Sequence, residues 1–332
     1  MTYKPPLPDH EPHKVFIHKG VCVDHARNDR AVPYKIYYPV ARDLKSLPVI
    51  LWSHGLGGGR DGAAFLARYI ASHGYVMVNL QHQGTDTSLW EGKPGHPWDV
   101  IKAAHIPRQD TLDRFHDVPF LLDCLPDIAR ENPDIGTHMD LGKIGMSGHS
   151  FGALTTQVMA GQPFPDKDDK PTSLRETRFK AGILYSFVPM KHLTSEAPEK
   201  IYDDMTLPLF FMTGTDDENP ISGQGYQYRM PVFDHAGCPE KALLVLKEGD
   251  HMVFAGSRGK LESHPKRHLH ENIIKTASLA YWEAYLKENK EARQWLTGNG
   301  LKNWLGEEGQ YEFKRKSSAP DHANNIRPTS PA

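Results

Sequence analysis

Short apolar runs alternate along the chain with longer amphipathic segments. A short, continuously apolar run is typical of a buried strand, whereas apolar residues three and four positions apart are typical of a helix that covers a core. The alternation predicts an α/β fold, with a mostly parallel central sheet and helices on both of its faces. The expected strands cover residues 15–23, 34–38, 49–52, 75–80, 141–146, 181–185, 209–212 and 242–246.

Helices are expected between these strands, at residues 63–70, 110–129, 153–161 and 273–288. Two insertions, residues 83–109 and 162–178, are broken by Pro and are predicted to be loops. Neither is long enough for a large cap domain, so residues 1–309 are predicted to form one α/β domain. Residues 310–332 are charged and then rich in Pro, Ser and Asn, which predicts a flexible C-terminal tail.

Composition narrows the function classes. The chain has 332 residues and a formal net charge of −2, with scattered Lys and Arg, which gives no electrostatic footprint for nucleic acid. It contains no apolar run of about 18 residues that would span a membrane. The N-terminus lacks the apolar core of a signal peptide, so a cytoplasmic location is expected. Three widely spaced cysteines, at positions 22, 124 and 238, indicate free thiols rather than a disulfide framework or a zinc site.

The most informative motif is Gly148-His149-Ser150-Phe151-Gly152, which fits the G-x-S-x-G pattern of a nucleophile elbow. A serine hydroxyl becomes an effective nucleophile when a sharp strand-to-helix turn exposes it to a histidine. The flanking glycines are needed because backbones approach closely at such a turn. The expected strand before the motif and the expected helix after it fit this context, so Ser150 is predicted to be a catalytic nucleophile.

The two partners of a catalytic triad are expected downstream, in the order acid and then histidine. Asp216 and Asp217 follow the expected strand 209–212, and His251 follows the expected strand 242–246. These strand ends lie at the carboxyl edge of the sheet, where such folds bind ligands. Either aspartate is a candidate; Asp216 is favoured because its position four residues before Pro220 resembles that of the catalytic acid in serine hydrolases with such an elbow. His251 is expected to be the general base.

Stabilisation of an oxyanion requires two backbone N–H donors. The amide of Phe151, directly after the nucleophile, is one candidate. The amide of Leu56 is the other, because the Gly-rich loop 53–59 follows a strand and passes close to the site. The same loop lacks the spacing of a dinucleotide fingerprint and the Gly-Lys-Ser/Thr of a P-loop, so a phosphate site is disfavoured.

The remaining candidates are less specific. Trp90 and Trp98 in the insertion 83–109, and Phe187 after the strand 181–185, are expected to line the acyl side of the cleft. No lid helix is evident. Three histidines, at positions 264, 268 and 270, are close in sequence but lack further ligands at metal-site spacing, so no metal and no cofactor are expected.

Together, the segments His54-Gly55-Leu56-Gly57, Ala71-Ser72-His73-Gly74-Tyr75 and Gly148-His149-Ser150-Phe151-Gly152 resemble α/β-hydrolases of the dienelactone hydrolase and platelet-activating-factor acetylhydrolase-like group. The resemblance covers about residues 45–255. It implies a serine esterase with a Ser-His-Asp triad and an oxyanion hole formed by the Leu56 and Phe151 amides.

The chain departs from this group in two respects. The acid of the acetylhydrolases follows the strand after the elbow helix, where this chain has Ser186, so the acid is expected one strand later, at Asp216, as in lipases, cutinases and polyester hydrolases. Dienelactone hydrolases use a cysteine nucleophile, whereas this chain has Ser150. Phospholipid or dienelactone specificity is therefore not inferred from the resemblance.

We accordingly expect a serine hydrolase that cleaves small carboxylic esters, with short to medium acyl groups or a polyester-like substrate, through an acyl-enzyme. The same triad also supports amide or thioester cleavage. A catalytically silent hydrolase fold used for binding is the alternative from another class, and an intact triad argues against it.

Overall fold

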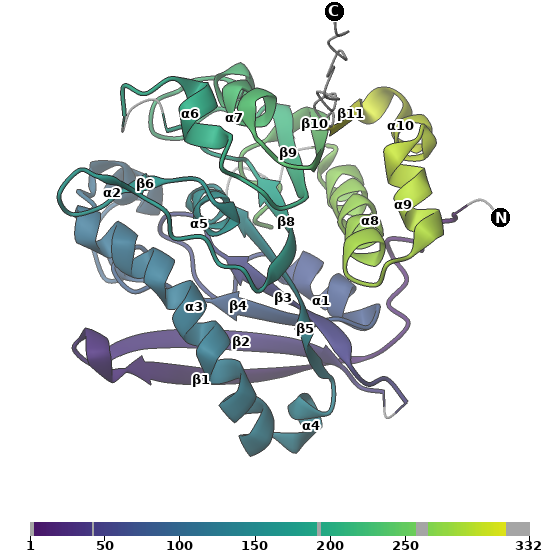
Figure 1. The fold of residues 1–332 in the computed structure, drawn as a ribbon, viewed down its shortest axis with the longest axis horizontal. Helices are drawn as coiled ribbons and strands as arrows, with labels where there is room; N and C mark the ends of the chain where they lie inside the picture. The colour runs from purple at the N-terminus through teal and green to yellow at the C-terminus, as the bar shows by residue number, and fades with distance from the viewer. Residues whose placement is uncertain (1–2, 42, 191–193, 257–264, 317–332) are drawn as a thin grey trace, which may run out of the picture.

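The computed structural model describes residues 3–41, 43–190, 194–256 and 265–316. In this part of the chain, a nine-stranded sheet has the order β1-β2-β4-β3-β5-β8-β9-β10-β11 (Figure 1). All pairings from β4 to β10 are parallel, and those of β1, β2 and β11 are antiparallel. The strands are β1 (Val15–Asp24), β2 (Arg30–Pro39), β3 (Leu47–Ser53), β4 (Val76–Leu80), β5 (Met139–His149), β8 (Phe179–Tyr185), β9 (Leu209–Asp216), β10 (Glu240–Asp250) and β11 (Gly309–Arg315).

Helices cover both faces of this sheet, so the predicted α/β class is confirmed (Figure 1). One face packs against α3 (Arg108–Glu131), α5 (Phe151–Ala160), α6 (Pro198–Tyr202) and α7 (Met230–His235). The other face packs against α1 (Ala64–Ser72), α8 (Arg267–Tyr285), α9 (Lys290–Thr297) and α10 (Gly300–Leu305). Shorter elements lie between them: α2 (Pro97–Ala103), α4 (Pro133–Gly136), η1 (His25–Arg27), η2 (Thr87–Leu89), η3 (Tyr226–Arg229) and η5 (Gly306–Glu308).

The central strands are largely apolar because helices cover both of their faces. Every residue of β3, with the sequence Leu-Pro-Val-Ile-Leu-Trp-Ser, is buried. The long helix α3 continues through Pro119 and Pro126, while its buried side includes Phe115 and Leu121. Packing against the sheet therefore outweighs the loss of helical hydrogen bonds at the two prolines.

Two expectations about irregular segments are wrong. The insertion 83–109 contains the short helix α2, and residues 309–315 are not a flexible tail but the edge strand β11, paired antiparallel with β10. Tyr311 packs against the apolar core on one face of that strand, which explains why it is ordered. The insertion 162–178 holds a small ribbon made of β6 (Phe164–Pro165) and β7 (Pro171–Thr172). Residues 317–332 lie outside the described part.

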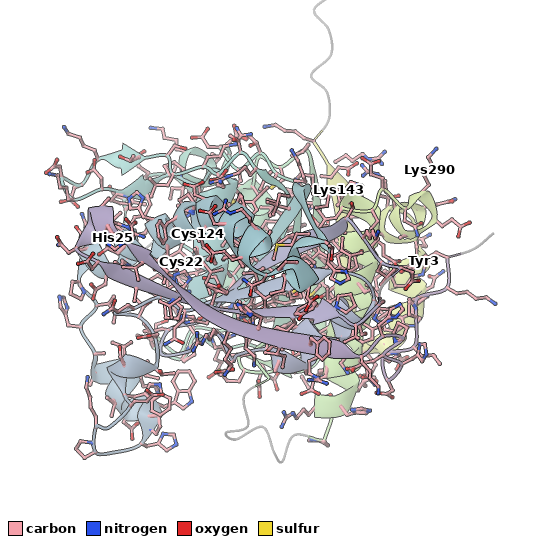
Figure 2. The ribbon with its side chains drawn as sticks, turned by 90° about the horizontal axis from the view of Figure 1, so that it is seen from below. Tyr3, Cys22, His25, Cys124, Lys143 and Lys290 are labelled. Carbon is pink, nitrogen blue, oxygen red and sulfur yellow. The ribbon has the colours of Figure 1, made fainter. Side chains whose placement is uncertain are left out.

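The three cysteines are free thiols, as predicted. Cys22 on β1 and Cys124 on α3 lie side by side (Figure 2). Burial is the largest cause that raises the pKa of Cys22, to about 12, so this thiol is protonated and unreactive near neutral pH. None of the described helices is long and apolar enough to cross a membrane.

Candidate active site

Ser150 lies at the sharp turn between β5 and α5, with backbone angles φ 55° and ψ −115°. A positive φ is costly for a residue with a Cβ, and strain of this kind is common at functional turns. The two glycines of the motif are sterically required. A Cβ on Gly148 would lie 2.2 Å from the carbonyl oxygen of Gly152, and a Cβ on Gly152 would lie 1.8 Å from the carbonyl oxygen of Ser53. The geometry is that of a nucleophile elbow.

The acid that contacts His251 is Asp217, not Asp216. Nδ1 of His251 lies 2.7 Å from Oδ1 of Asp217, whose side chain is fully buried. Strand β9 continues through Asp216, whose side chain is exposed and accepts a hydrogen bond from the adjacent Thr215 hydroxyl. The chain then turns, with the Asp217 amide donating to the carbonyl of Gly214, and this turn directs the next side chain inward. The prediction of Asp216 is therefore wrong by one residue.

Asp217 is held by three side chains. Its Oδ2 accepts from the Thr213 hydroxyl at 2.7 Å, and its Oδ1 accepts from the Arg229 guanidinium at 2.8 Å as well as from His251. Burial alone would raise the pKa of Asp217, but attraction to His251 and Arg229 and these hydrogen bonds outweigh it, so that the pKa is strongly lowered. Asp217 is therefore a carboxylate near neutral pH, and donation to it leaves Nε2 of His251 as the nitrogen able to accept a proton.

Arg229 was not predicted. It lies at the end of η3 and also donates to the carbonyl oxygen of Phe187 at 2.8 Å, so it connects the segments after β8 and β9. Arg229 belongs to no recognisable sequence motif, and Arg side chains are usually exposed, so the sequence alone did not indicate it. Only the fold shows that its side chain is buried against Asp217.

Ser150 and His251 line the same cavity. In the described part of the chain the Ser150 hydroxyl has no hydrogen-bond partner, as is common for catalytic hydroxyls without a substrate. His149, beside Ser150, supports the loop of His251: its Nε2 lies 2.7 Å from the His251 carbonyl oxygen. Burial is the largest cause that lowers the pKa of His149, to about 3, so this ring is neutral and donates.

The loop after β3 is anchored on both sides of Leu56. Nε2 of His54 accepts from the backbone N–H of His82 at 3.0 Å, and the Gly57 amide donates to the carbonyl of Thr85 at 2.9 Å. The indole of Trp90 donates to the Gly57 carbonyl at 2.7 Å. The Leu56 amide has no partner among the described residues, and Leu56 and Phe151 line the same cavity as Ser150.

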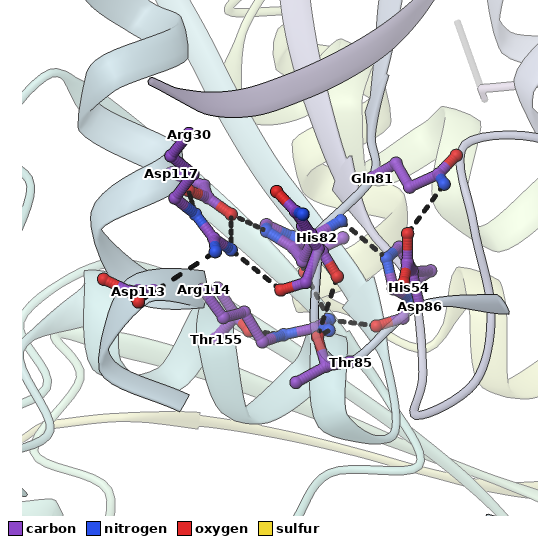
Figure 3. A network of polar contacts seen from close by, with 12 residues as sticks. Arg30, His54, Gln81, His82, Thr85, Asp86, Asp113, Arg114, Asp117 and Thr155 are labelled. Carbon is purple, nitrogen blue, oxygen red and sulfur yellow. Dashed lines mark hydrogen bonds and ion pairs between the residues drawn. The ribbon is translucent and has the colours of Figure 1, made fainter. Parts of the chain in front are cut away.

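A second Ser-His-Asp network, formed by Ser53, His82 and Asp117, lies where this loop begins; His82 and Asp117 are labelled in Figure 3. The Ser53 hydroxyl is 3.0 Å from Nε2 of His82, and Nδ1 of His82 is 3.1 Å from Oδ2 of Asp117. All three side chains are completely buried, and Ser53 does not line the cavity. Burial is the largest cause that lowers the pKa of His82, to about 4. An ester cannot reach Ser53, so this network supports the fold around the site.

The cavity has a volume of about 1610 Å³. Trp90 and Trp98 both line it, but Phe187 does not: its ring is fully buried and packs edge-to-face on Phe211. Its neighbour Val188 lines the wall instead. The apolar lining also includes Leu56, Ile101, Ile106, Phe151, Leu154, Phe164 and Ile221.

The histidines at 268 and 270 are engaged separately. His270 is buried with Nε2 2.9 Å from the carbonyl oxygen of Lys247, whereas His268 is exposed and lies near Asp9. His264 lies outside the described residues. No group of three or more His, Cys, Asp or Glu side chains in the described part is arranged to hold a metal ion.

Comparison with known proteins finds one matching family model and several distant relatives. A family model described as "Platelet-activating factor acetylhydrolase, isoform II" matches residues 18–90, which include β2, β3, β4 and the loop around Leu56. The platelet-activating factor acetylhydrolase of Canis lupus familiaris is 22% identical over 302 residues, covering 76% of this chain and 60% of that protein. The enzyme of the same name from Cavia porcellus is 21% identical over 306 residues, covering 80% of this chain and 63% of that protein. A "putative phospholipase A2" of Schizosaccharomyces pombe is 22% identical over 313 residues, covering 73% of this chain and 68% of that protein.

These similarities are distant, and the chain spans less than two thirds of the length of the acetylhydrolases that it matches. They support the predicted resemblance to the acetylhydrolase group of α/β-hydrolases.

Proposed function

We propose that the chain is a serine hydrolase of carboxylic esters, with Ser150 as nucleophile, His251 as general base and Asp217 as the triad acid. The observation that carries the proposal is the 2.7 Å contact between His251 and the fully buried Asp217, beside a cavity that also exposes the elbow serine. The distant similarity to proteins named as acetylhydrolases and a phospholipase supports the same reaction class.

In this mechanism the Ser150 oxygen attacks the ester carbonyl carbon while its proton passes to Nε2 of His251. Asp217 remains a carboxylate and stabilises the imidazolium. The amides of Leu56 and Phe151 donate to the oxyanion. His251 then gives its proton to the leaving alcohol, and water releases the acid from Ser150 by the same steps in reverse.

The substrate class that we propose is an ester lipid with a scissile acyl group of short to medium length. The cavity volume of about 1610 Å³ exceeds the roughly 300–1,000 Å³ of a typical small-molecule pocket, so it has room for an extended apolar part beside the ester. The two tryptophans that line it and the other apolar lining residues suit such a chain.

The test combines covalent labelling with a substrate panel. A fluorophosphonate probe should add once per chain, with the adduct located on Ser150 by peptide mass spectrometry, and Ser150→Ala should lose both adduct and turnover while its melting temperature stays within a few degrees. Ser53→Ala, which alters the buried network, should still carry the adduct on Ser150. An adduct on Ser53, or turnover retained in Ser150→Ala, would refute the assignment.

The panel should contain p-nitrophenyl acetate, butyrate and dodecanoate, platelet-activating factor, and a thioester and an anilide of butyrate. We expect the esters to be hydrolysed faster than the anilide, and the lipid ester to have the highest kcat/KM. A higher kcat/KM for the thioester or the anilide than for every ester would contradict the substrate class and leave the triad intact.

A further inference from the structure

Arg114 of α3 is completely buried beneath the loop that follows β3 (Figure 3). Its guanidinium donates to oxygens that carry no formal charge. They are the hydroxyls of Ser53 at 2.8 Å, Thr85 at 3.0 Å and Thr155 at 2.8 Å, and the backbone carbonyl of His54. No carboxylate in the described part of the chain lies within ion-pair distance of Arg114.

The two acidic side chains whose charges favour the cationic form of Arg114, Asp117 and Asp86, form hydrogen bonds with other groups. Asp117 binds Arg30 through two hydrogen bonds of 2.7 and 2.9 Å and also contacts His82. Asp86 accepts from the amide of Gln81 at 2.7 Å and from Ser88. A buried cation without a direct counter-ion is unusual, because burial penalises charge. Burial lowers the pKa of Arg114 only to about 9, so the side chain remains cationic at neutral pH.

The contacts of Arg114 reach both segments that carry the candidate oxyanion donors. On one side it holds the carbonyl of His54, two residues before Leu56. On the other side Thr155, which accepts from Nε of Arg114, donates its own hydroxyl to the Phe151 carbonyl at 3.0 Å. The guanidinium also lies 4.5 Å from the centre of the Phe151 ring.

We propose that Arg114 is the positioning residue of the oxyanion hole: it fixes the Leu56 and Phe151 amides relative to each other and places a positive charge without a direct counter-ion behind them. The inference rests on the proposed function, since it requires Ser150 to form a tetrahedral intermediate. Donors aimed in advance at a developing oxyanion, in a site of low dielectric, lower the barrier without reorganisation during the reaction.

The sequence of α5 offers a matched pair of variants. Thr155 and Thr156 are both buried, and each donates its hydroxyl to the carbonyl four residues earlier at 3.0 Å. Only Thr155 touches Arg114. Thr155→Val therefore disturbs the link from Arg114 to Phe151 while Arg114 itself stays in place, and Thr156→Val controls for the loss of a buried hydroxyl in the same helix.

We expect Thr155→Val to lower kcat on a p-nitrophenyl ester about 10-fold to 100-fold with KM changed less than about threefold. Thr156→Val should stay within about twofold of the unmodified chain, and Thr155→Ser, which keeps the hydroxyl, should restore kcat. The readout specific to the oxyanion is the affinity of a trifluoromethyl ketone, which forms a tetrahedral adduct with the serine. It should fall in Thr155→Val by the same factor as kcat/KM, whereas binding of the planar carboxylic acid product should not change.

Equal losses in Thr155→Val and Thr156→Val, or a fall in kcat without a fall in ketone affinity, would overturn the role of Arg114. Fluorophosphonate labelling separates this failure from failure of the proposed function. If Ser150 is the nucleophile, the unmodified chain carries the adduct on Ser150 whatever the Thr155 variants do, and an unmodified chain that is not labelled there contradicts both.

Discussion

Replacing Asp217 by Asn should remove nearly all turnover, whereas the same replacement at the preceding Asp216 should leave it intact. The two carboxylates are adjacent in sequence, but only Asp217 reaches Nδ1 of His251, at 2.7 Å. An Asn amide at this position can donate to Nδ1, which favours the tautomer with the proton on Nε2, and that tautomer cannot accept the proton of Ser150.

The expected magnitude follows from the role of the acid. Loss of the triad carboxylate at unchanged geometry lowers kcat by about 10⁴-fold, which corresponds to about 5.5 kcal/mol of transition-state stabilisation. Stability should fall as well, because Arg229 is buried against Asp217 and loses its counter-ion. Breaking a buried ion pair costs up to about 3–5 kcal/mol, and the Phe187 carbonyl still accepts from Arg229, so the lower end is expected. Asp216→Asn alters an exposed side chain and should change stability by less than about 0.5 kcal/mol.

The assay is kcat and KM on p-nitrophenyl butyrate, together with urea unfolding of both variants followed by circular dichroism. Activity should be measured without urea, at a temperature at which both variants are more than nine-tenths folded. A lower kcat then reflects the active site and not a smaller amount of folded protein. The reasoning is refuted if folded Asp217→Asn keeps more than a tenth of kcat, or if Asp216→Asn loses more than Asp217→Asn does.

Three further predictions follow from the same structure. Gly152→Ala would place a Cβ 1.8 Å from a backbone carbonyl oxygen and should abolish activity and lower the melting temperature. Gly142→Ala on β5 is the control and should be tolerated, because its Cβ would have its nearest contact at 3.2 Å, on a side chain. Thermal melts and ester turnover of the two variants test this difference. Burial lowers the pKa of His149 to about 3 and of His82 to about 4, so below about pH 6.5 the unfolded chain binds more protons than the folded one. The free energy of unfolding should thus keep its full value above pH 6.5 and decrease as the pH is lowered toward 4, by about 2 kcal/mol per histidine at pH 5. Equal urea midpoints at pH 7 and pH 5 would exclude this. Trp98→Ala removes an aromatic wall of the cavity and should raise KM for p-nitrophenyl dodecanoate several-fold but not for the acetate, and equal effects on both esters would mean that Trp98 does not contact the acyl chain.

The elements that could be predicted from the sequence are those whose hydrophobic pattern follows from burial alone. Strand β3 is apolar from Leu47 to Trp52, and its position was predicted to within a few residues. Strand β11 was missed because an edge strand exposes one face: Tyr311 and Phe313 alternate with charged residues, and the charges resemble those of a solvated tail. Helix α2 was missed because only Ile101 of its seven residues is buried, which leaves no helical stripe.

Within the site, the elbow was predictable because steric needs restrict the residue types, but the acid was not. The choice between Asp216 and Asp217 depends on where β9 ends, and a boundary error of one residue exchanges an exposed side chain for a buried one. Arg114 did leave a signal in the sequence. It lies four positions before Val118 and seven before Leu121 on the buried side of α3, where a charge needs partners that the helix itself does not supply.

The two Ser-His-Asp networks of this chain show that residue types and distances do not by themselves identify a catalytic triad. Ser53, His82 and Asp117 are joined by contacts of 3.0 and 3.1 Å, which by distance alone make a complete triad. Yet Ser53 has no accessible surface, so a substrate cannot reach its hydroxyl, which also accepts a hydrogen bond from Arg114. Ser150 has no such partner, lies on a strained turn with a positive φ, and borders a large cavity. Accessibility of the serine and freedom of its hydroxyl therefore distinguish the two, and the buried network is best understood as the support that holds the His54–Leu56 loop above Arg114.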